Sequence, residues 1–242
     1  MSSCVAFLGP SLSHEQARRI VGNECGLLPP VRRGDLPSLP SSIRVVAIID
    51  GVFHSESSVG HREILEQLRR GVDVVGGGSM GALRASELDS MGMTGIGEVY
   101  ELYASKRIDG DDEVALIFNP ETLEALSEPL VNMRHNLEKA ASRGIISAEN
   151  SNFLLTKMKS IYYPKRTKDM MIDFARVTLE PKTLSKFEKF VRDNYVDIKM
   201  KDAEEVLRYV IKIAKNIEQI DKKTVRINGL KSNFKTVKRK DI

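Results

Sequence analysis

The strongest structural signal in this chain of 242 residues is VDVVGGGSMGALRASEL, residues 72–88. It begins with an apolar run typical of a buried strand, passes through three glycines and a serine, and ends with apolar residues at helical spacing. A strand that turns directly into a helix is the repeating unit of α/β proteins with a parallel sheet. The segment leaves open whether Ser79 is a nucleophile, part of a phosphate loop, or only the first residue of a helix.

The same strand-then-helix pattern occurs twice before this segment. CVAFLG (4–9) and RVVAIIDG (44–51) are predicted strands, and residues 13–22 and 61–71 are predicted helices. After Gly97 the spacing is mostly helical, and no comparably clear strand pattern returns before TVRING (224–229). We therefore expect an N-terminal Rossmann-like α/β half with a parallel sheet, followed by a mostly helical C-terminal half. The expected units are residues 1–118 with the Gly-Ser turn, 119–200 as a helical part completing the site, and 201–242 as an amphipathic helix with a basic tail.

Composition narrows the class of protein. The chain is 41% hydrophobic and 29% charged, as expected for a folded globular protein, and its net charge of +4 is small. It has no tryptophan and only 6% aromatic residues, which argues against a surface for stacking nucleic-acid bases. No apolar run approaches the ~18 residues of a membrane span, and the first residues lack the features of a signal peptide. We expect a cytoplasmic protein in which Cys4 and Cys25 are buried and reduced, without membrane or nucleic-acid partners.

Two patterns in the glycine-rich turn suggest nucleotide binding, and both are incomplete. Gly76, Gly78 and Gly81 have the spacing of the dinucleotide-binding fingerprint, but the following residues do not predict the strand with a terminal acidic residue that this site requires. The lysine that a P-loop places after its last glycine is missing. Nucleotide binding through this turn is therefore the weakest hypothesis, and we expect no cofactor and no metal.

A third pattern, Gly77-x-Ser79-x-Gly81, fits a nucleophile elbow as well as it fits a serine that caps a helix. A nucleophilic serine requires a base. His61 lies near the preceding strand without an obvious acidic partner, and we place it as a supporting residue. Lysine serves as a base when burial lowers its pKa. Lys157 and Lys159 border an apolar stripe on a predicted helix, where either is equally compatible with a surface position.

Several motifs between about Val5 and Arg166 resemble those of the TfuA-like protein family and occur in the same order. The motifs are IIDGVF (48–53), HREIL (61–65), GGGSMGALRASEL (76–88), GMTGIGEVYELY (92–103), DGDDEVA (109–115), SEPLVNMR (127–134) and KSIYYPKR (159–166). This resemblance implies a role in peptide-backbone thioamidation together with a YcaO enzyme. It also implies hydrolysis of the C-terminal thiocarboxylate of a ThiS-type sulfur carrier, which releases sulfide, and assistance to YcaO in binding its peptide or protein substrate. Methyl-coenzyme M reductase is a candidate substrate if the source is a methane-metabolising archaeon.

The resemblance also implies a Ser–Lys site. The serine corresponds to Ser79, and the lysine corresponds to Lys159, with Lys157 as the alternative. The expected supporting or substrate-binding residues are Asp50, His61, Gly78, Met80, Gly81, Arg84 and Glu87. Arg84 and Glu87 are three residues apart on the predicted helix, so Glu87 can hold the Arg84 guanidinium in place, although a plain surface pair fits equally well.

Two points remain open on the sequence alone. The chain is either a hydrolase or a non-catalytic adaptor that bridges YcaO, carrier and substrate while Ser79 merely caps a helix. The acidic segment DGDDEVA lacks the spacing of a calcium loop. It fits an acidic turn that caps a helix or a docking surface for a basic partner.

Overall fold

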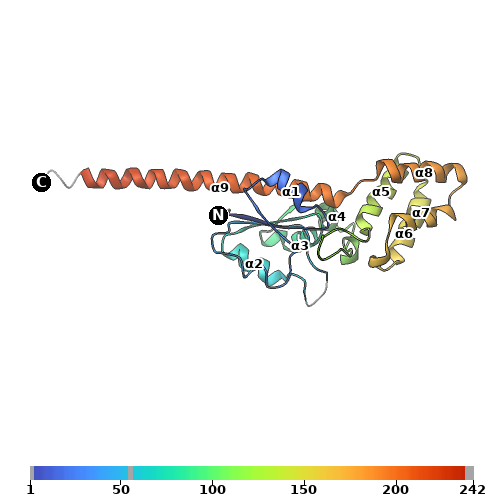
Figure 1. Cartoon of the computed structure of the whole chain (residues 1–242), viewed down its shortest axis with the longest axis horizontal. Coiled ribbons are helices and arrows are strands. Elements are labelled where there is room, and N and C mark those ends of the chain that lie inside the picture. Colours follow the sequence, from blue (N-terminus) through green and yellow to red (C-terminus); the bar gives the residue numbers. More distant parts are fainter. Residues whose placement is uncertain (1–2, 54–56, 238–242) are drawn as a thin grey trace.

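The computed structural model describes residues 3–53 and 57–237, with side chains described as far as residue 220. A parallel sheet flanked by helices forms the N-terminal part, and a group of helices lies at one end of it (Figure 1). The predicted α/β half followed by a mostly helical half is confirmed. In chain order, the strands are β1 (Cys4–Phe7), β2 (Gly26–Leu28), β3 (Val45–Ile48), β4 (Asp73–Gly77) and β5 (Thr94–Ile96).

The helices around the sheet have clear local causes. They are α1 (His14–Val21), α2 (His61–Arg69), α3 (Met80–Leu88) and α4 (Glu98–Ala104). Ser13 and Gln16 form a capping box at the start of α1. Gly71, with φ of +77°, follows α2 at the position where the sequence predicted a stop. The helical group comprises α5 (Leu130–Ser142), α6 (Ala148–Ser160), α7 (Lys168–Arg176) and α8 (Pro181–Asn194).

Within the described residues, the sheet has five strands in the order β2-β1-β3-β4-β5, and all pairs are parallel. The sequence did not predict β2 or β5. Each has only three residues and is rich in glycine and leucine or threonine, so neither shows a β-branched apolar run. Pairing with β1 and β4, respectively, makes them strands. The expectation that no strand follows the glycine-rich turn is therefore wrong, because β5 follows α3.

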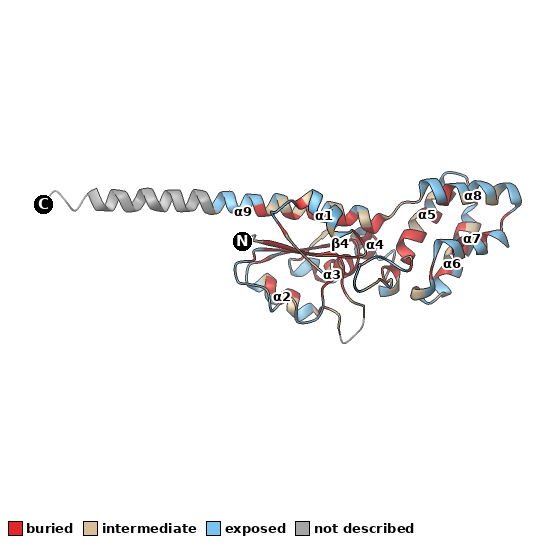
Figure 2. Ribbon diagram, in the orientation of Figure 1, coloured by how far each residue is buried: buried red, intermediate tan, exposed pale blue. Residues whose placement is uncertain are grey.

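Helices cover both faces of the sheet, and each face has its own apolar core. On one face, α1 and the last helix, α9 (Ile198–Val237), pack on alternate residues of β1 and β3 such as Ala6 and Ala47. On the other face, α2 and α3 pack on the intervening residues, such as Phe7 and Ile48. The strands and the inner helix surfaces are accordingly buried (Figure 2). Period-two alternation in a doubly covered sheet produces these two cores.

Helix α9 joins the two parts of the molecule. Its apolar stripe, Ala203, Val206, Leu207, Val210 and Ala214, is buried against the sheet. The predicted amphipathic helix is thus part of the α/β core. The strand-like interpretation of TVRING (224–229) is wrong, because the backbone there continues α9. The basic tail from residue 221 onward lies outside the residues whose side chains are described.

Asp202 anchors α9 to the start of α4. Its carboxylate is 2% exposed and accepts hydrogen bonds from the backbone N–H groups of Glu98 (2.9 Å) and Val99 (2.8 Å). Burial raises the pKa of this carboxyl to about 7, although the two N–H donors act in the opposite direction. Gly97 precedes α4, and a Cβ there would overlap the Asp202 carboxylate.

This anchor predicts a pH-dependent stability. Because the folded pKa lies above the ordinary value of 3.8, the folded chain retains the Asp202 proton to higher pH than the unfolded chain. Its contribution is full below about pH 4 and is lost as the pH rises toward 7, an effect on the order of 1–3 kcal/mol. The free energy of unfolding, measured with denaturant from pH 4.5 to 8, should fall less steeply for Asp202→Asn than for the wild type. Parallel curves for the two proteins would contradict the prediction.

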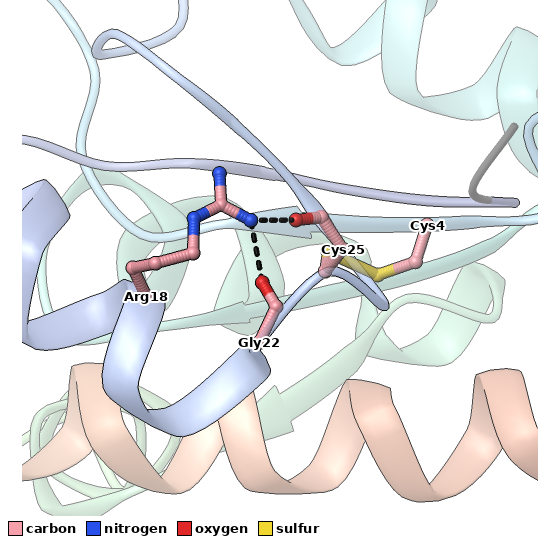
Figure 3. Close-up of a disulfide and its surroundings, with 4 residues drawn as sticks. All are labelled: Cys4, Arg18, Gly22 and Cys25. Atoms are coloured by element: carbon pink, nitrogen blue, oxygen red, sulfur yellow. Dashed lines mark hydrogen bonds between the residues drawn. A yellow bond between two sulfur atoms is a disulfide. The ribbon is translucent and has the colours of Figure 1, made fainter.

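The two cysteines form a disulfide rather than the two free thiols that the sequence suggested (Figure 3). Both are buried, as expected, but pairing of β1 with β2 brings their Cα atoms to 4.7 Å. This distance is within the range that a disulfide spans. Arg18 of α1 donates to the backbone carbonyls of Gly22 and Cys25, which holds the chain between α1 and β2. The sequence could not indicate the disulfide because β2 was not predicted.

The disulfide should stabilise the oxidised protein. Cys4 and Cys25 are separated by 21 positions, for which loop closure in the unfolded chain predicts about 3 kcal/mol. We expect Cys4→Ser to lower the melting temperature relative to the oxidised wild type in calorimetry. A reducing agent should lower the wild-type value and leave that of Cys4→Ser unchanged. An equal response of both proteins to the reducing agent would show that the bond contributes nothing.

Candidate functional site

The candidate site is built around the turn from β4 into α3. Gly78 has φ of +70°, a left-handed conformation that favours glycine, and it places Ser79 at the N-cap of α3. Ser79 is 1% exposed and its side chain makes no capping hydrogen bond. The helix-cap role considered for its hydroxyl is therefore absent. Among the described residues, the backbone N–H of Met80 has no hydrogen-bond acceptor, so the turn combines a buried hydroxyl with an available donor.

The glycines on both sides of Ser79 allow α3 to lie directly on the sheet. A Cβ at Gly81 would overlap the carbonyl oxygen of Ile48 in β3, and a Cβ at Gly76 would overlap the carbonyl of Gly81. The N–H of Gly81 donates to the carbonyl of Ile49 at 3.1 Å. The glycine spacing is thus explained by backbone packing, without a bound phosphate.

Gly81→Ala should be strongly destabilising, because the added methyl group meets backbone atoms that cannot move independently of the sheet. We expect a loss of about 3 kcal/mol or more in the free energy of unfolding, measured by denaturant titration. Ser86→Ala is a matched control on the same helix, where the change should stay within about 0.5 kcal/mol. Similar stabilities for the two variants would show that α3 does not depend on this contact.

The turn lies beside the point where the strand order of the sheet reverses. The chain runs from β1 to β2 on one side and then returns to β3 on the other, and open α/β sheets bind ligands at the carboxyl ends of strands related in this way. Asp50 follows β3 there and is 1% exposed. Its carboxylate accepts from the N–H of Gly9 (2.9 Å), the N–H of Ser11 (3.0 Å) and the Ser11 hydroxyl (2.6 Å). Asp50 thereby ties together the loops that follow β1 and β3.

A buried lysine that is not among the predicted site residues, Lys199, lies next to the Ser79 turn. Lys199, in the first turn of α9, is 2% exposed, and its backbone carbonyl lies against Gly78. Its Nζ donates to the carbonyl of Val114 at 2.9 Å. Burial lowers the pKa of this ammonium group below the usual lysine value. The negative charges of Asp50, Asp197 and Glu128 act in the opposite direction.

The two lysines expected from the sequence occupy a different environment. Lys157 and Lys159 are exposed on α6, a helix that packs chiefly on α5 and α7 (Figures 1 and 2). The sequence position of Lys199 is itself unusual. It lies four residues before Ala203 on the apolar stripe of α9, where a lysine on a buried face is unusual.

The remaining predicted residues gather around a pocket of about 600 Å³ next to the turn. The Arg84 guanidinium donates to Glu87 (2.7 Å), as expected, and Glu87 also contacts Nε2 of His61 (2.6 Å). Arg84 additionally donates to the carbonyl of Val59 (3.2 Å). The pocket is lined by Arg33, Phe53, Ser58, Val59, Gly60, His61, Met80, Leu83, Arg84, Glu87, Asp109, Gly110 and Asp111. His61 is thus held by Glu87 at this pocket and does not cap α2.

The acidic segment DGDDEVA packs onto the helical group through two ion pairs. The Asp112 carboxylate accepts from Arg166 (2.6 Å), whose guanidinium is 2% exposed. Glu113 is buried and pairs with Arg134 of α5. In the described part of the chain, no group of three or more histidine, cysteine, aspartate or glutamate side chains is placed to hold a metal ion. The segment therefore fixes the loop that presents the Val114 carbonyl to Lys199.

A comparison with protein families matches residues 50–167 to the TfuA-like protein family. This region is similar to TfuA-like proteins. The match contains the Ser79 turn, Asp50, the acidic segment and α5, whereas Lys199 lies beyond it. No curated protein shows significant similarity to the chain.

Among the helices of the described residues, none combines the length and apolar character needed to cross a membrane.

Proposed function

We propose that this TfuA-like chain hydrolyses the C-terminal thiocarboxylate of a ThiS-type sulfur carrier and so supplies sulfide to a YcaO enzyme. Ser79 is the nucleophile and Lys199, in place of Lys159, is the base. The observation that carries the proposal is a buried lysine with a lowered pKa whose backbone carbonyl lies against Gly78, the residue before an uncapped serine. Burial favours the neutral amine, which is the form that accepts a proton.

The chemistry requires no cofactor. Neutral Lys199 takes the Ser79 proton while Oγ attacks the thiocarboxylate carbon, and the Met80 N–H donates to the developing oxyanion. The C–S bond then breaks, and the Lys199 ammonium returns the proton to sulfur, which leaves as hydrosulfide. Water, deprotonated by Lys199, cleaves the acyl–Ser79 ester and restores the serine. The carrier leaves as a carboxylate.

The surrounding residues suggest how the carrier tail binds. Arg84, held by Glu87, offers donors at the pocket beside Met80, and His61 lies on the same wall. These residues contact the tail or the carrier surface in the proposal. Because Ser79 is only 1% exposed, the reaction includes a step in which neighbouring residues open a path to it. Such a step suits an enzyme that works together with YcaO and a peptide or protein substrate.

The decisive measurement is sulfide release from a thiocarboxylated ThiS-type carrier. We expect Ser79→Ala and Lys199→Met to lose at least about 100-fold in rate while remaining folded by circular dichroism. Lys201→Met is a matched control, exposed two residues further along α9, and should keep the wild-type rate. The wild-type rate should rise with pH, with a midpoint below the usual lysine pKa, as Lys199 loses its proton.

Each other outcome leads to a different conclusion. If Lys159→Ala or Lys157→Ala abolishes release while Lys199→Met does not, the base is the lysine on α6. If Ser79→Ala is as active as the wild type, or the wild type releases no sulfide above background, the hydrolase proposal fails. The burial of Ser79 would then favour the second candidate, a non-catalytic adaptor that bridges YcaO, carrier and substrate.

A further inference from the structure

Two buried asparagines on α5 hold the chain at the point where α9 begins. Asn132 and Asn136 are each 1% exposed and lie one helical turn apart. The Asn136 side chain accepts from the N–H of Val196 (2.8 Å) and donates to its carbonyl (2.7 Å). The Asn132 Oδ1 atom accepts from the N–H of Ile198 (3.0 Å) and of Lys199 (3.4 Å). Side-chain hydrogen bonds from α5 therefore hold the backbone of Val196, Ile198 and Lys199 at the start of α9.

The Asn132 contact has the chemistry of a helix cap supplied from another helix. The first N–H groups of any α-helix lack partners within it, and a buried N–H without a partner is costly. A capping side chain normally precedes its helix by one residue. Asp197 supplies this ordinary cap for α9 by accepting from the N–H of Met200 (2.9 Å), and Asn132, 66 positions before Ile198, accepts from the two N–H groups ahead of it. The position and orientation of the first turn of α9 thus depend on α5 as well as on Asp197.

Asn132 is also connected to the groups that surround the Lys199 ammonium. Its Nδ2 donates to Glu128 (3.0 Å), one of the three carboxylates that act on the pKa of Lys199. The other two come from different elements, Asp50 after β3 and Asp197 just before α9. The Nζ of Lys199 donates to the Val114 carbonyl, and the backbone of Lys199 lies in the first turn of α9, where Asn132 accepts its N–H. Both the geometry and the charge around Nζ therefore depend on this asparagine.

We propose that Asn132 is a positioning residue that holds Lys199 beside the Ser79 turn. Asn136, by contrast, only attaches the preceding residues to α5. The kinetic consequence of this assignment rests on the proposed function, but the placement of Lys199 does not. The role is also distinct from fold stability, because loss of either asparagine destabilises the same junction and only loss of Asn132 disturbs Lys199.

The test compares Asn132→Ala with Asn136→Ala, each of which removes buried hydrogen bonds between α5 and the start of α9. The titration of Lys199 is followed by NMR of protein labelled with ¹³C at lysine Cε, with its signal identified by its loss in Lys199→Arg. We expect the Lys199 midpoint in Asn132→Ala to rise by about one pH unit, because a loosened first turn admits water. Asn136→Ala should lower the melting temperature without moving the midpoint.

Sulfide release provides a second readout. We expect Asn132→Ala to reduce kcat by about 10- to 100-fold with little change in KM, because the amine is misplaced relative to Ser79 while the binding pocket is intact. Asn136→Ala should lose less than about threefold in kcat. If Asn132→Ala fails to fold, Asn132→Leu fills nearly the same volume without the acceptor and should show the same titration and kinetics.

The outcomes separate this inference from the proposed function. An unchanged Lys199 midpoint in both Asn132 variants would overturn the positioning role, even if the wild type is an active hydrolase. Equal shifts in the Asn132 and Asn136 variants would overturn it too, because they would show a merely structural junction. If the wild type releases no sulfide, the hydrolase proposal fails, and the NMR titration alone still decides whether Asn132 positions Lys199.

Discussion

The backbone contact between α3 and the sheet is the constraint on which the candidate site depends. Gly81 lies so close to Ile48 that no side chain fits between them, and Gly76 faces the same helix. This contact sets where α3 begins and therefore where Ser79 lies. Helix α3 has little freedom to shift at this contact, because the interior of a protein packs as densely as an organic crystal. The serine is consequently held by the sheet itself and not by a surface loop.

A second constraint is the return of α9 to the sheet after the helical group. The apolar stripe of α9 completes one of the two cores, and Asp202 ties it to the start of α4. Lys199, in the first turn of α9, is buried as well. Burying a charge is unfavourable unless it is neutralised or paired, and burial accordingly lowers the pKa of the Lys199 ammonium group. An apolar side chain at position 199 would let α9 pack without burying an amine.

The family match and the geometry divide the candidate site between two parts of the chain. Residues 50–167 contain Ser79, Asp50 and the asparagines of α5, whereas the buried lysine comes from beyond this range. The connection is physical, because Val114 and Asn132 both contact Lys199. In this chain, the region that matches the TfuA-like family contacts Lys199 but does not contain it.

The alternating first half of the fold, the capping box at Ser13 and the pair of Arg84 with Glu87 could be predicted from sequence, because each is local. A strand beside a helix, or two residues one turn apart, depends on neighbours only a few positions away. The three-residue strands β2 and β5, the disulfide and the placement of Lys199 could not be predicted in this way. Each depends on segments that are distant in sequence and adjacent only after folding, such as Asn132 and the start of α9. Local periodicity therefore established the elements and the Ser79 turn, whereas long-range backbone contacts brought the backbone of a buried lysine, Lys199, against that turn.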